Sequence, residues 1–195
     1  IWARSTLRTI NKFSVVEMDA CTVNGKYFFS LTGMGFDAYA AKVFDREPGR
    51  GLHTYVLSIF KSLFSYQPFP YRLNAGDKHF EGSAFMINVC NSNQFGNNVK
   101  IAPDASVTDG LFNVCLVKDF PKWKAPLLLL RLALGKHRNS RYVEYFKTPS
   151  VTVTAPNRAY LHIDGEPELR AKKFDIKIVP EKLKVLVRPG TKTNV

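Results

Sequence analysis

The sequence contains few cysteines, and they match no disulfide or zinc-binding pattern. There are three, Cys21, Cys90 and Cys115, and no two of them form a Cys-x-x-Cys pair. An odd number without such a pair argues against a disulfide framework and against a structural zinc site. We therefore expect a protein of a reducing compartment such as the cytosol.

Long apolar segments are also missing. The longest apolar run, at residues 125–134, is interrupted by Arg131 and is too short to cross a bilayer. Arg4 and Arg8 are followed by no apolar stretch, so no signal peptide is predicted. Because the first residue is Ile rather than Met, we expect a fragment or a processed product.

Acidic residues are scarce compared with basic ones. The 16 Asp and Glu residues are outnumbered by 28 Lys and Arg residues, which gives a formal net charge of +12. This excess favours the binding of anions such as nucleotides, nucleic acid or acidic lipid headgroups. Solubility alone is the alternative explanation. No Gly-x-x-x-x-Gly-Lys-Ser/Thr phosphate loop and no nucleophile elbow occurs.

Short apolar segments of strand-like length dominate the chain. Many such strands at near-regular spacing predict an antiparallel sandwich or barrel. Because helical spacing of apolar residues is also present, the predicted class is α+β, mainly β: an antiparallel β-sandwich with two or three helices. The predicted strands are residues 13–21, 27–32, 71–82 (a hairpin-like unit), 84–90, 111–117, 142–147, 150–154, 159–163, 173–178 and 183–187, and the predicted helices are residues 38–44, 52–66 and 122–137.

Turn-forming residues separate these elements. Asn24-Gly25 is a strong signal for a hairpin turn. Residues 33–37, Gly-Met-Gly-Phe-Asp, are expected to break the strand ladder, and Asp37 or a neighbour is expected to cap the helix that follows. Further turns are predicted at residues 155–157, 164–165 and 180–181.

A long polar loop within residues 83–117 is the first candidate for a functional segment. It runs from residue 91 to residue 110, and loops of more than about 12 residues are usually functional or disordered. Its own apolar residues, Phe95, Val99 and Ile101, predict that it is ordered. Residues 91–98 are rich in Asn and Gly, which tolerate positive φ and can turn backbone N–H groups toward an anion. A purely conformational need for these residues is the alternative.

Asp104 and Asp109 lie near the end of this loop. A carboxylate followed by glycine, as in Asp109-Gly110, can hold a hard cation while backbone carbonyls add further oxygens. Mg²⁺ prefers oxygen ligands and keeps several waters, so one carboxylate and two carbonyls would suffice. A plain Asp-Gly turn is the alternative.

A second acidic turn follows a predicted strand. Residues 162–167 read His-Ile-Asp-Gly-Glu-Pro and place Asp164 and Glu166 at a tight turn. Two acids there could supply a general base and an additional metal contact. An acidic, solvated hairpin turn is the alternative.

Three segments occur in a characteristic order: residues 28–38 (Phe-Phe-Ser-Leu-Thr-Gly-Met-Gly-Phe-Asp-Ala), residues 91–114 and the Asp-Gly-Glu-Pro of residues 164–167. Together they resemble the C-terminal half of the bacterial diacylglycerol kinase and sphingosine kinase family. The resemblance covers residues 19–187. Its most specific marks are the Asn-x-x-x-x-Gly, Pro-Asp-Ala and Asp-Gly-Leu series and the Asp-Gly-Glu-Pro segment.

The resemblance implies a protein of two lobes. An N-terminal α/β lobe would carry a Gly-Gly-Asp-Gly-Thr nucleotide loop, and a C-terminal β-sandwich lobe of the NAD kinase/diacylglycerol kinase-like fold would close the cleft. This sequence contains no Gly-Gly-Asp-Gly and resembles the second lobe alone. Residues 1–18 are then a lead-in with the first strand, residues 19–195 are the β-sandwich lobe, and the nucleotide-binding lobe is absent from the chain.

The resemblance also implies site residues. By position, Mg²⁺ would be bound by the side chain of Asp109 with main-chain oxygens of Ser106 and Leu111. Glu166 would be the proton acceptor, and Asp164 would stand beside it, toward nucleotide or metal. The family often has three glycines where this chain has Gly96-Asn97-Asn98, which puts the approach of that backbone to a ligand in doubt.

The implied function is the ATP-dependent phosphorylation of a lipid hydroxyl, of a diacylglycerol or sphingoid type, with this lobe inactive by itself. The expected partners are ATP, the missing lobe and a lipid at a membrane surface, and the expected location is cytoplasmic, peripheral at the inner face of the membrane. The resemblance leaves open whether a homodimer forms. No RNP or OB signature is present, so nucleic acid is not an expected partner. A non-catalytic regulatory lipid-binding or nucleic-acid-binding module is the alternative.

Overall fold

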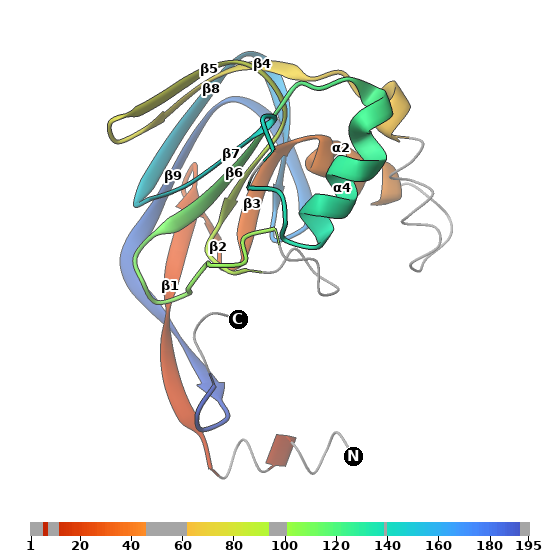
Figure 1. Cartoon of the computed structure of the whole chain (residues 1–195). Coiled ribbons are helices and arrows are strands. Elements are labelled where there is room, and N and C mark those ends of the chain that lie inside the picture. Colours follow the sequence, from red (N-terminus) through yellow and green to blue (C-terminus); the bar gives the residue numbers. More distant parts are fainter. Residues whose placement is uncertain (1–5, 8–11, 46–61, 94–100, 139, 192–195) are drawn as a thin grey trace.

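Nine antiparallel strands and two longer helices make up the part of the chain that the computed structural model describes, residues 6–7, 12–45, 62–93, 101–138 and 140–191. The strands form one curved sheet in the order β2-β1-β9-β8-β3-β5-β6-β7, and β4 pairs with both β5 and β8 (Figure 1). The elements are β1 (Ser14–Val23), β2 (Lys26–Phe28), β3 (Leu31–Gly35), α2 (Phe36–Asp45), β4 (Phe69–Ala75), β5 (Lys78–Cys90), β6 (Phe112–Lys118), the 3-10 helix η1 (Lys122–Lys124), α4 (Ala125–Ala133), β7 (Val143–Thr148), β8 (Ser150–Ile163) and β9 (Glu166–Val187).

The two longest central strands hold the sheet together. One half of β5 pairs with β4 and the other half with β3, and β8 does the same from the opposite side. The strands β3 and β4 therefore lie end to end between β5 and β8. This arrangement confirms the predicted α+β, mainly β, sandwich-like fold.

The predicted hairpin turn at Asn24-Gly25 is confirmed. Both residues have positive φ, 50° and 83°, as a two-residue hairpin turn requires. The Asn24 side chain also accepts a hydrogen bond from the backbone N–H of Asp175 and donates one to the carbonyl oxygen of Lys173, both at 2.8 Å. The turn is thereby fixed to the neighbouring strand β9.

The prediction of one continuous return strand at residues 27–32 is wrong, because these residues contain parts of two separate strands. The strand β2 ends at Phe28, and the chain bends at residues 29–30 before β3 joins β5 and β8 instead of β1. The cause lies far along the sequence, because the carboxylate of Asp164 accepts hydrogen bonds from the backbone at this bend.

The expectation that residues 33–37 break the ladder is confirmed only from Phe36 onward, where α2 begins, because residues 33–35 are part of β3. Gly33 pairs with Asn88 on one side and with His162 on the other. A Cβ atom at Gly33 would overlap with the side chains of Asp37, His162 and Asn88. Glycine at this position therefore makes room for side chains inside the sheet and does not form a turn.

The turns predicted at residues 155–157 and 180–181 are wrong as well. The strands β8 and β9 run through these positions, and each shows an irregular register there. Pro156 lies within the shift between Thr154 and Ala159, and Pro180 lies within the shift opposite Asp19 and Cys21. Because proline lacks an N–H group, it is tolerated in a sheet at such bulges.

The helices agree in part with the prediction. The helix α2 confirms the helix predicted at residues 38–44. The prediction for residues 122–137 is too long, because α4 ends at Ala133 and Gly135 follows with φ 66°. Of the helix predicted at residues 52–66, residues 52–61 lie outside the described residues, and residues 62–65 are helical. No described helix is long and apolar enough to cross a membrane.

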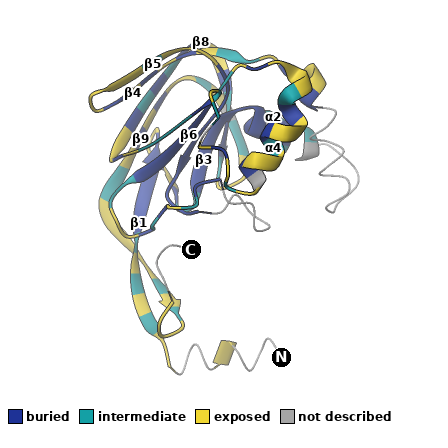
Figure 2. Ribbon diagram, viewed as in Figure 1, coloured by how far each residue is buried: buried dark blue, intermediate teal, exposed yellow. Residues whose placement is uncertain are grey.

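Two apolar cores lie on the two faces of the sheet. One fills the inside of the curved strands and contains Phe28, Leu73 and Phe112. The other lies between the sheet and the helices and contains Phe85 and Leu128. Figure 2 shows the resulting band of buried residues along the strands. The outer halves of β1 and β9, paired from Ser14 with Val187 onward, extend away from this body as a ribbon (Figure 1).

Candidate functional site

The turn between β8 and β9 carries the two acids predicted to be catalytic. Asp164 and Gly165 have φ values of 49° and 91°, as a tight two-residue hairpin turn requires. The Asp164 carboxylate accepts backbone hydrogen bonds of 2.8–3.0 Å from Phe29, Ser30 and Leu31. Both of its oxygens are thus engaged, and the side chain fixes this turn against the bend between β2 and β3.

Glu166 is placed differently from Asp164. It is the first residue of β9, pairs in register with Ile163, and exposes its side chain. No side chain or backbone group among the described residues binds its carboxylate. The described part of the protein therefore does not hold this carboxylate, and its role as general base stays a prediction.

A buried pair beneath this turn was not predicted from the sequence. The Nε2 atom of His162 lies 3.0 Å from the Oδ2 atom of Asp37, and their side chains are 1% and 5% exposed. The backbone N–H of Gly165 points at Nδ1 of His162 at 3.3 Å. Because Nδ1 accepts that hydrogen bond, Nε2 carries the proton and donates a hydrogen bond to Oδ2 of Asp37.

Asp37 was one of the residues expected to cap the helix that follows β3. Its Oδ1 atom does accept a 2.8 Å hydrogen bond from the backbone N–H of Ala38, within the first turn of α2. The second oxygen, which binds His162, joins α2 to the end of β8. The only available signal was the position of His162 two residues before the Asp-Gly-Glu turn.

The loop with the predicted Mg²⁺ ligands lies in residues 101–111. The Asp109 carboxylate accepts a 3.1 Å hydrogen bond from the backbone N–H of Leu111 and forms a 2.8 Å ion pair with Lys147. Ser106 lies at the same loop, with its hydroxyl 3.4 Å from that of Thr108. The Lys147 ammonium group therefore stands where a cation near Asp109 would stand.

The expected donors of this loop are carboxylate and main-chain oxygens, the kind of ligand that a hard cation such as Mg²⁺ prefers. Among the described residues no group of three or more His, Cys, Asp or Glu side chains could hold a metal ion. One carboxylate with main-chain oxygens and waters is a set that Mg²⁺ accepts. Asp104, the other acid of this loop, forms an ion pair with Arg138. Residues 94–100, which include Phe95, Val99 and Gly96-Asn97-Asn98, lie outside the described residues.

Asp19 is a buried carboxylate that holds this loop and was not predicted. Its side chain accepts a 2.9 Å hydrogen bond from the backbone N–H of Gly110 and forms an ion pair with Lys182. Its backbone N–H donates to the carbonyl oxygen of Val107 at 2.7 Å. The strand β1 thus fixes the loop immediately beside Asp109.

Asn91 completes the connection between the two acidic turns. Its side-chain amide donates to the carbonyl oxygens of Asp19 and Phe29 at 3.1 and 2.8 Å. Its backbone N–H donates to the carbonyl oxygen of Ser30, whose own N–H binds Asp164. A continuous series of hydrogen bonds therefore runs from the loop with Asp109 to the turn with Asp164 and Glu166.

A mostly apolar pocket of about 490 Å³ lies along this connection. Asp164 and Val107 both line this pocket, so the β8–β9 turn and the loop of residues 101–111 share one concavity. The two acids Asp109 and Glu166 are not among its lining residues. Its other lining residues come mainly from β1, β9 and the bend after β2. They are Val16, Met18, Phe29, Ser30, Ser92, Val185, Val187 and Thr191.

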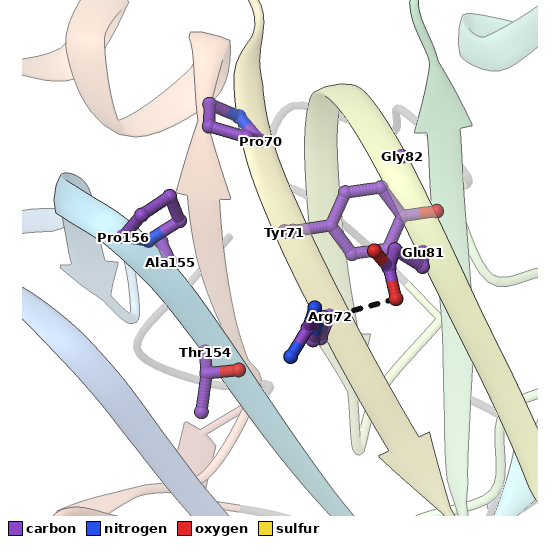
Figure 3. Close-up of a pocket in the computed structure, with 8 residues that line it drawn as sticks. All are labelled: Pro70, Tyr71, Arg72, Glu81, Gly82, Thr154, Ala155 and Pro156. Carbon is purple, nitrogen blue, oxygen red and sulfur yellow. Dashed lines mark ion pairs between the residues drawn. The ribbon is translucent and has the colours of Figure 1, made fainter.

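A second pocket, of about 480 Å³, lies on β4, β5 and β8 (Figure 3). Its clearest polar feature is the 3.1 Å ion pair between Arg72 and Glu81, two exposed side chains. The remaining lining residues are Pro70, Tyr71, Gly82, Thr154, Ala155 and Pro156. It contains none of the acids predicted from the sequence, so the candidate site is the one at Asp164.

Comparison with known proteins identifies the family to which this chain is similar. The family described as the YegS C-terminal NAD kinase beta sandwich-like domain matches residues 30–187. A Shewanella frigidimarina protein named "Probable lipid kinase YegS-like" is 25% identical over 191 residues, which is 96% of this chain and 60% of the relative. A Yersinia pestis protein of the same name is 26% identical, over 95% of this chain and 62% of the relative.

Solved structures show the same fold at low sequence identity. A diacylglycerol kinase from Bacillus anthracis superposes with a TM-score of 0.63 at 16% identity, over 90% of this chain and 55% of that protein. An NAD kinase from Archaeoglobus fulgidus in complex with ATP gives a TM-score of 0.54 at 9% identity, over 97% of this chain and 61% of that protein. The chain thus spans about 60% of the length of the curated relatives that it matches.

Proposed function

Because the chain belongs to the family of the YegS C-terminal NAD kinase beta sandwich-like domain, we propose that it is the C-terminal lobe of an ATP-dependent lipid kinase. The reaction is the transfer of the γ-phosphoryl group of ATP to a lipid hydroxyl of the diacylglycerol or sphingoid type. One structural observation carries the proposal. The loop with Asp109 and the turn with Glu166 are connected through Asp19, Asn91 and Ser30, although they are far apart in sequence.

Glu166 acts as the general base in this proposal. Its exposed carboxylate takes the proton of the lipid hydroxyl as that hydroxyl attacks the γ-phosphorus. Asp164 acts as a positioning residue, because its three backbone hydrogen bonds hold the turn on which Glu166 stands. Its carboxylate would have to give up some of those bonds to contact a nucleotide or a metal.

Mg²⁺ would be held by the Asp109 side chain and the main-chain oxygens of Ser106 and Leu111. When bound there, the ion supplies positive charge that orders the loop and offsets phosphate charge. The exposed Lys147 side chain is free to turn toward solvent and leave Asp109 to the ion.

The chain matches about 60% of the length of its curated relatives. In this proposal the nucleotide-binding loop lies in the part of the full-length protein that corresponds to the remainder of those relatives. Phosphoryl transfer depends on positioning and on charge stabilisation by such a loop. Residues 1–195 contain no Gly-Gly-Asp-Gly sequence, so this chain alone is inactive. The full-length protein acts at the cytoplasmic face of a membrane, where its lipid substrate lies.

The test compares two glutamates of β9 in the full-length protein. Glu166→Gln removes the base without changing shape, and we expect a loss of turnover of about 10²–10⁴-fold at an unchanged melting temperature. Glu181→Gln changes another exposed glutamate of the same strand and keeps full activity. ATP-dependent lipid phosphorylation is measured with radiolabelled ATP and a panel of lipids.

Three results would contradict parts of the proposal. Normal turnover of Glu166→Gln would remove this residue from the role of base. A wild-type protein without turnover on any lipid of the panel would favour a non-catalytic lipid-binding module. Phosphorylation by residues 1–195 alone would overturn the proposed inactivity of the isolated lobe.

A further inference from the structure

An exposed apolar stripe runs along α4 and the turn before it. Trp123, in η1, is 77% exposed, and Leu127, Leu130 and Leu134 are 55–59% exposed. Their spacing of four, three and four residues places them on one side of a helix. The opposite side of α4 is packed against the core through Leu128 and Leu132. The helix is therefore apolar on two sides, and the strands cover only one.

The stripe is extended by another exposed aromatic residue. The Lys122 ammonium group donates a 2.7 Å hydrogen bond to the backbone carbonyl of Phe64, which fixes the turn at residues 62–65 beside the start of α4. The Phe64 side chain is 70% exposed. Figure 2 shows exposed residues on α4, in contrast with the buried strands behind it. We call the set Phe64, Trp123, Leu127, Leu130 and Leu134 the α4 surface.

The segment around the α4 surface is strongly basic. Residues 120–143 contain no acidic residue, and their six basic ones are Lys122, Lys124, Arg131, Lys136, Arg138 and Arg141. Of these, Arg138 is neutralised by Asp104.

Two of the basic side chains converge on a group without charge. Lys124 and Arg141 donate hydrogen bonds of 3.1 and 2.6 Å to the Tyr142 hydroxyl. The hydrogen bonds from Arg141 and Lys124 lower the pKa of Tyr142, which reflects the positive potential at this corner. Since no carboxylate among the described residues pairs with either of them, both are available to an external anion.

We propose that the α4 surface docks the protein on an anionic lipid bilayer. The helix lies in the plane of the interface with its leucines and aromatic rings at the boundary of headgroups and acyl chains. Lys124, Arg131, Lys136 and Arg141 contact lipid phosphates. An amphipathic helix with apolar residues on one side and basic residues at its flanks binds membranes in this way.

Charge decides between a bilayer and a second copy of the chain. A symmetric dimer through α4 would bring two segments with six basic residues each, and no acid, against one another. Like charges at a contact oppose association, whereas an anionic headgroup layer complements them. The Arg138–Asp104 ion pair also joins the end of this segment to the loop with Asp109, so the docked bilayer lies beside that loop.

The inference is independent of the proposed kinase activity, because it uses only α4 and its flanking charges. The test is flotation of the full-length protein with two kinds of vesicle, phosphatidylcholine alone and phosphatidylcholine mixed with phosphatidylglycerol. The variant Leu127→Ser/Leu130→Ser removes exposed apolar side chains and should leave the melting temperature unchanged. The matched control, Leu183→Ser/Leu186→Ser, changes two exposed leucines of β9.

We expect wild type and control to float with the phosphatidylglycerol vesicles and to be released by salt. The α4 variant should lose binding by about tenfold or more, as removal of two apolar anchors predicts. Arg131→Glu/Lys136→Glu should weaken binding to these vesicles as well. Undiminished binding of the α4 variant, or equal binding of wild type to both kinds of vesicle, overturns the inference.

Two further outcomes assign the α4 surface to another occupant and also overturn the inference. A wild-type dimer that becomes monomeric in the α4 variant, measured by light scattering, identifies a second copy. A markedly lower melting temperature of the variant identifies a segment of the chain itself.

Activity toward a short-chain, water-soluble diacylglycerol separates this inference from the proposed function. The α4 variant should keep that activity, while Glu166→Gln should bind vesicles and lack activity. Loss of the soluble-substrate activity in the α4 variant would place α4 in the reaction itself and overturn its assignment as a docking surface.

Discussion

His162 and Asp37 face each other inside the sheet, with Nε2 of the histidine 3.0 Å from Oδ2 of the aspartate. They are 125 residues apart in sequence and join the end of β8 to the start of α2. The backbone N–H of Gly165 binds the other ring nitrogen of His162. The pair thus supports the turn that carries Asp164 and Glu166.

We predict that His162→Ala destabilises the fold strongly. The change creates a cavity and leaves the Oδ2 atom of the buried Asp37 carboxylate without its hydrogen-bond partner, and loss of one partner of a buried pair costs about 3–5 kcal/mol. The free energy of unfolding, measured in urea, should fall by that amount. His79→Ala is the control, because this exposed histidine binds only Asn74 among the described residues, and should cost much less. Equal losses in the two variants would show that the buried pair contributes little.

Gly33→Ala tests the crowding inside β3. The added methyl group would overlap with the side chains of Asp37, His162 and Asn88. Overpacking of this kind costs about 1–3 kcal/mol. A double-mutant cycle with Asp37→Ala provides the control, because removal of the Asp37 carboxylate makes room and should reduce the cost of Gly33→Ala. Strictly additive changes in the free energy of unfolding would contradict this account.

The class of fold could be predicted from local patterns, whereas the lengths of several strands could not. Apolar runs such as residues 84–90 and 111–117 indicated the buried parts of β5 and β6 correctly, because residues 84–90 and 112–117 are buried on both faces. Pro156 and Pro180 suggested turns but lie at bulges within long strands. Whether a proline ends a strand or occupies a bulge depends on its neighbours in space, which one sequence does not reveal.

The same limit applies to the candidate site. The acidic turns at Asp109 and Asp164 are local in sequence and could be recognised there. Asp19 and Asn91 act through hydrogen bonds to residues far along the chain, such as the bond between Asp19 and Gly110 at a sequence separation of 91, so no local motif marks them. The carboxylate of Asp164 likewise determines where β2 ends, from more than 130 positions away.

Asp164 and Glu166 should differ in how their removal affects the protein. Asp164→Ala breaks three backbone hydrogen bonds at an exposed corner, and we expect a loss of about 1–2 kcal/mol in the free energy of unfolding. Glu166→Gln breaks no hydrogen bond within the described residues and should leave stability unchanged. Chemical denaturation of both variants of the full-length protein measures this difference. If Asp164→Ala is as stable as wild type, the carboxylate does not hold the turn and is available for a ligand.

His137 should make the stability of the fold depend on pH. Burial of this imidazole, together with the nearby Arg138, lowers its pKa below the ordinary value. As the pH falls below about 6.5, His137 therefore binds a proton in the unfolded chain but not in the folded chain. The contribution of His137 to the free energy of unfolding is then fully present above this pH and is lost as the pH drops below it. Urea titrations at pH 7.5 and 5 should show a smaller loss in His137→Phe than in wild type.

His79→Gln is the control for this comparison, since it removes an exposed histidine whose hydrogen bond to Asn74 lies at the surface. It should keep the pH dependence of wild type, because it leaves the buried His137 in place. The centroids of the His137 and Tyr145 rings lie 5.6 Å apart in an edge-on contact. A Phe ring at position 137 should keep this contact with Tyr145. A His137→Phe variant that loses as much stability between pH 7.5 and 5 as wild type would show that acid unfolding begins at other groups.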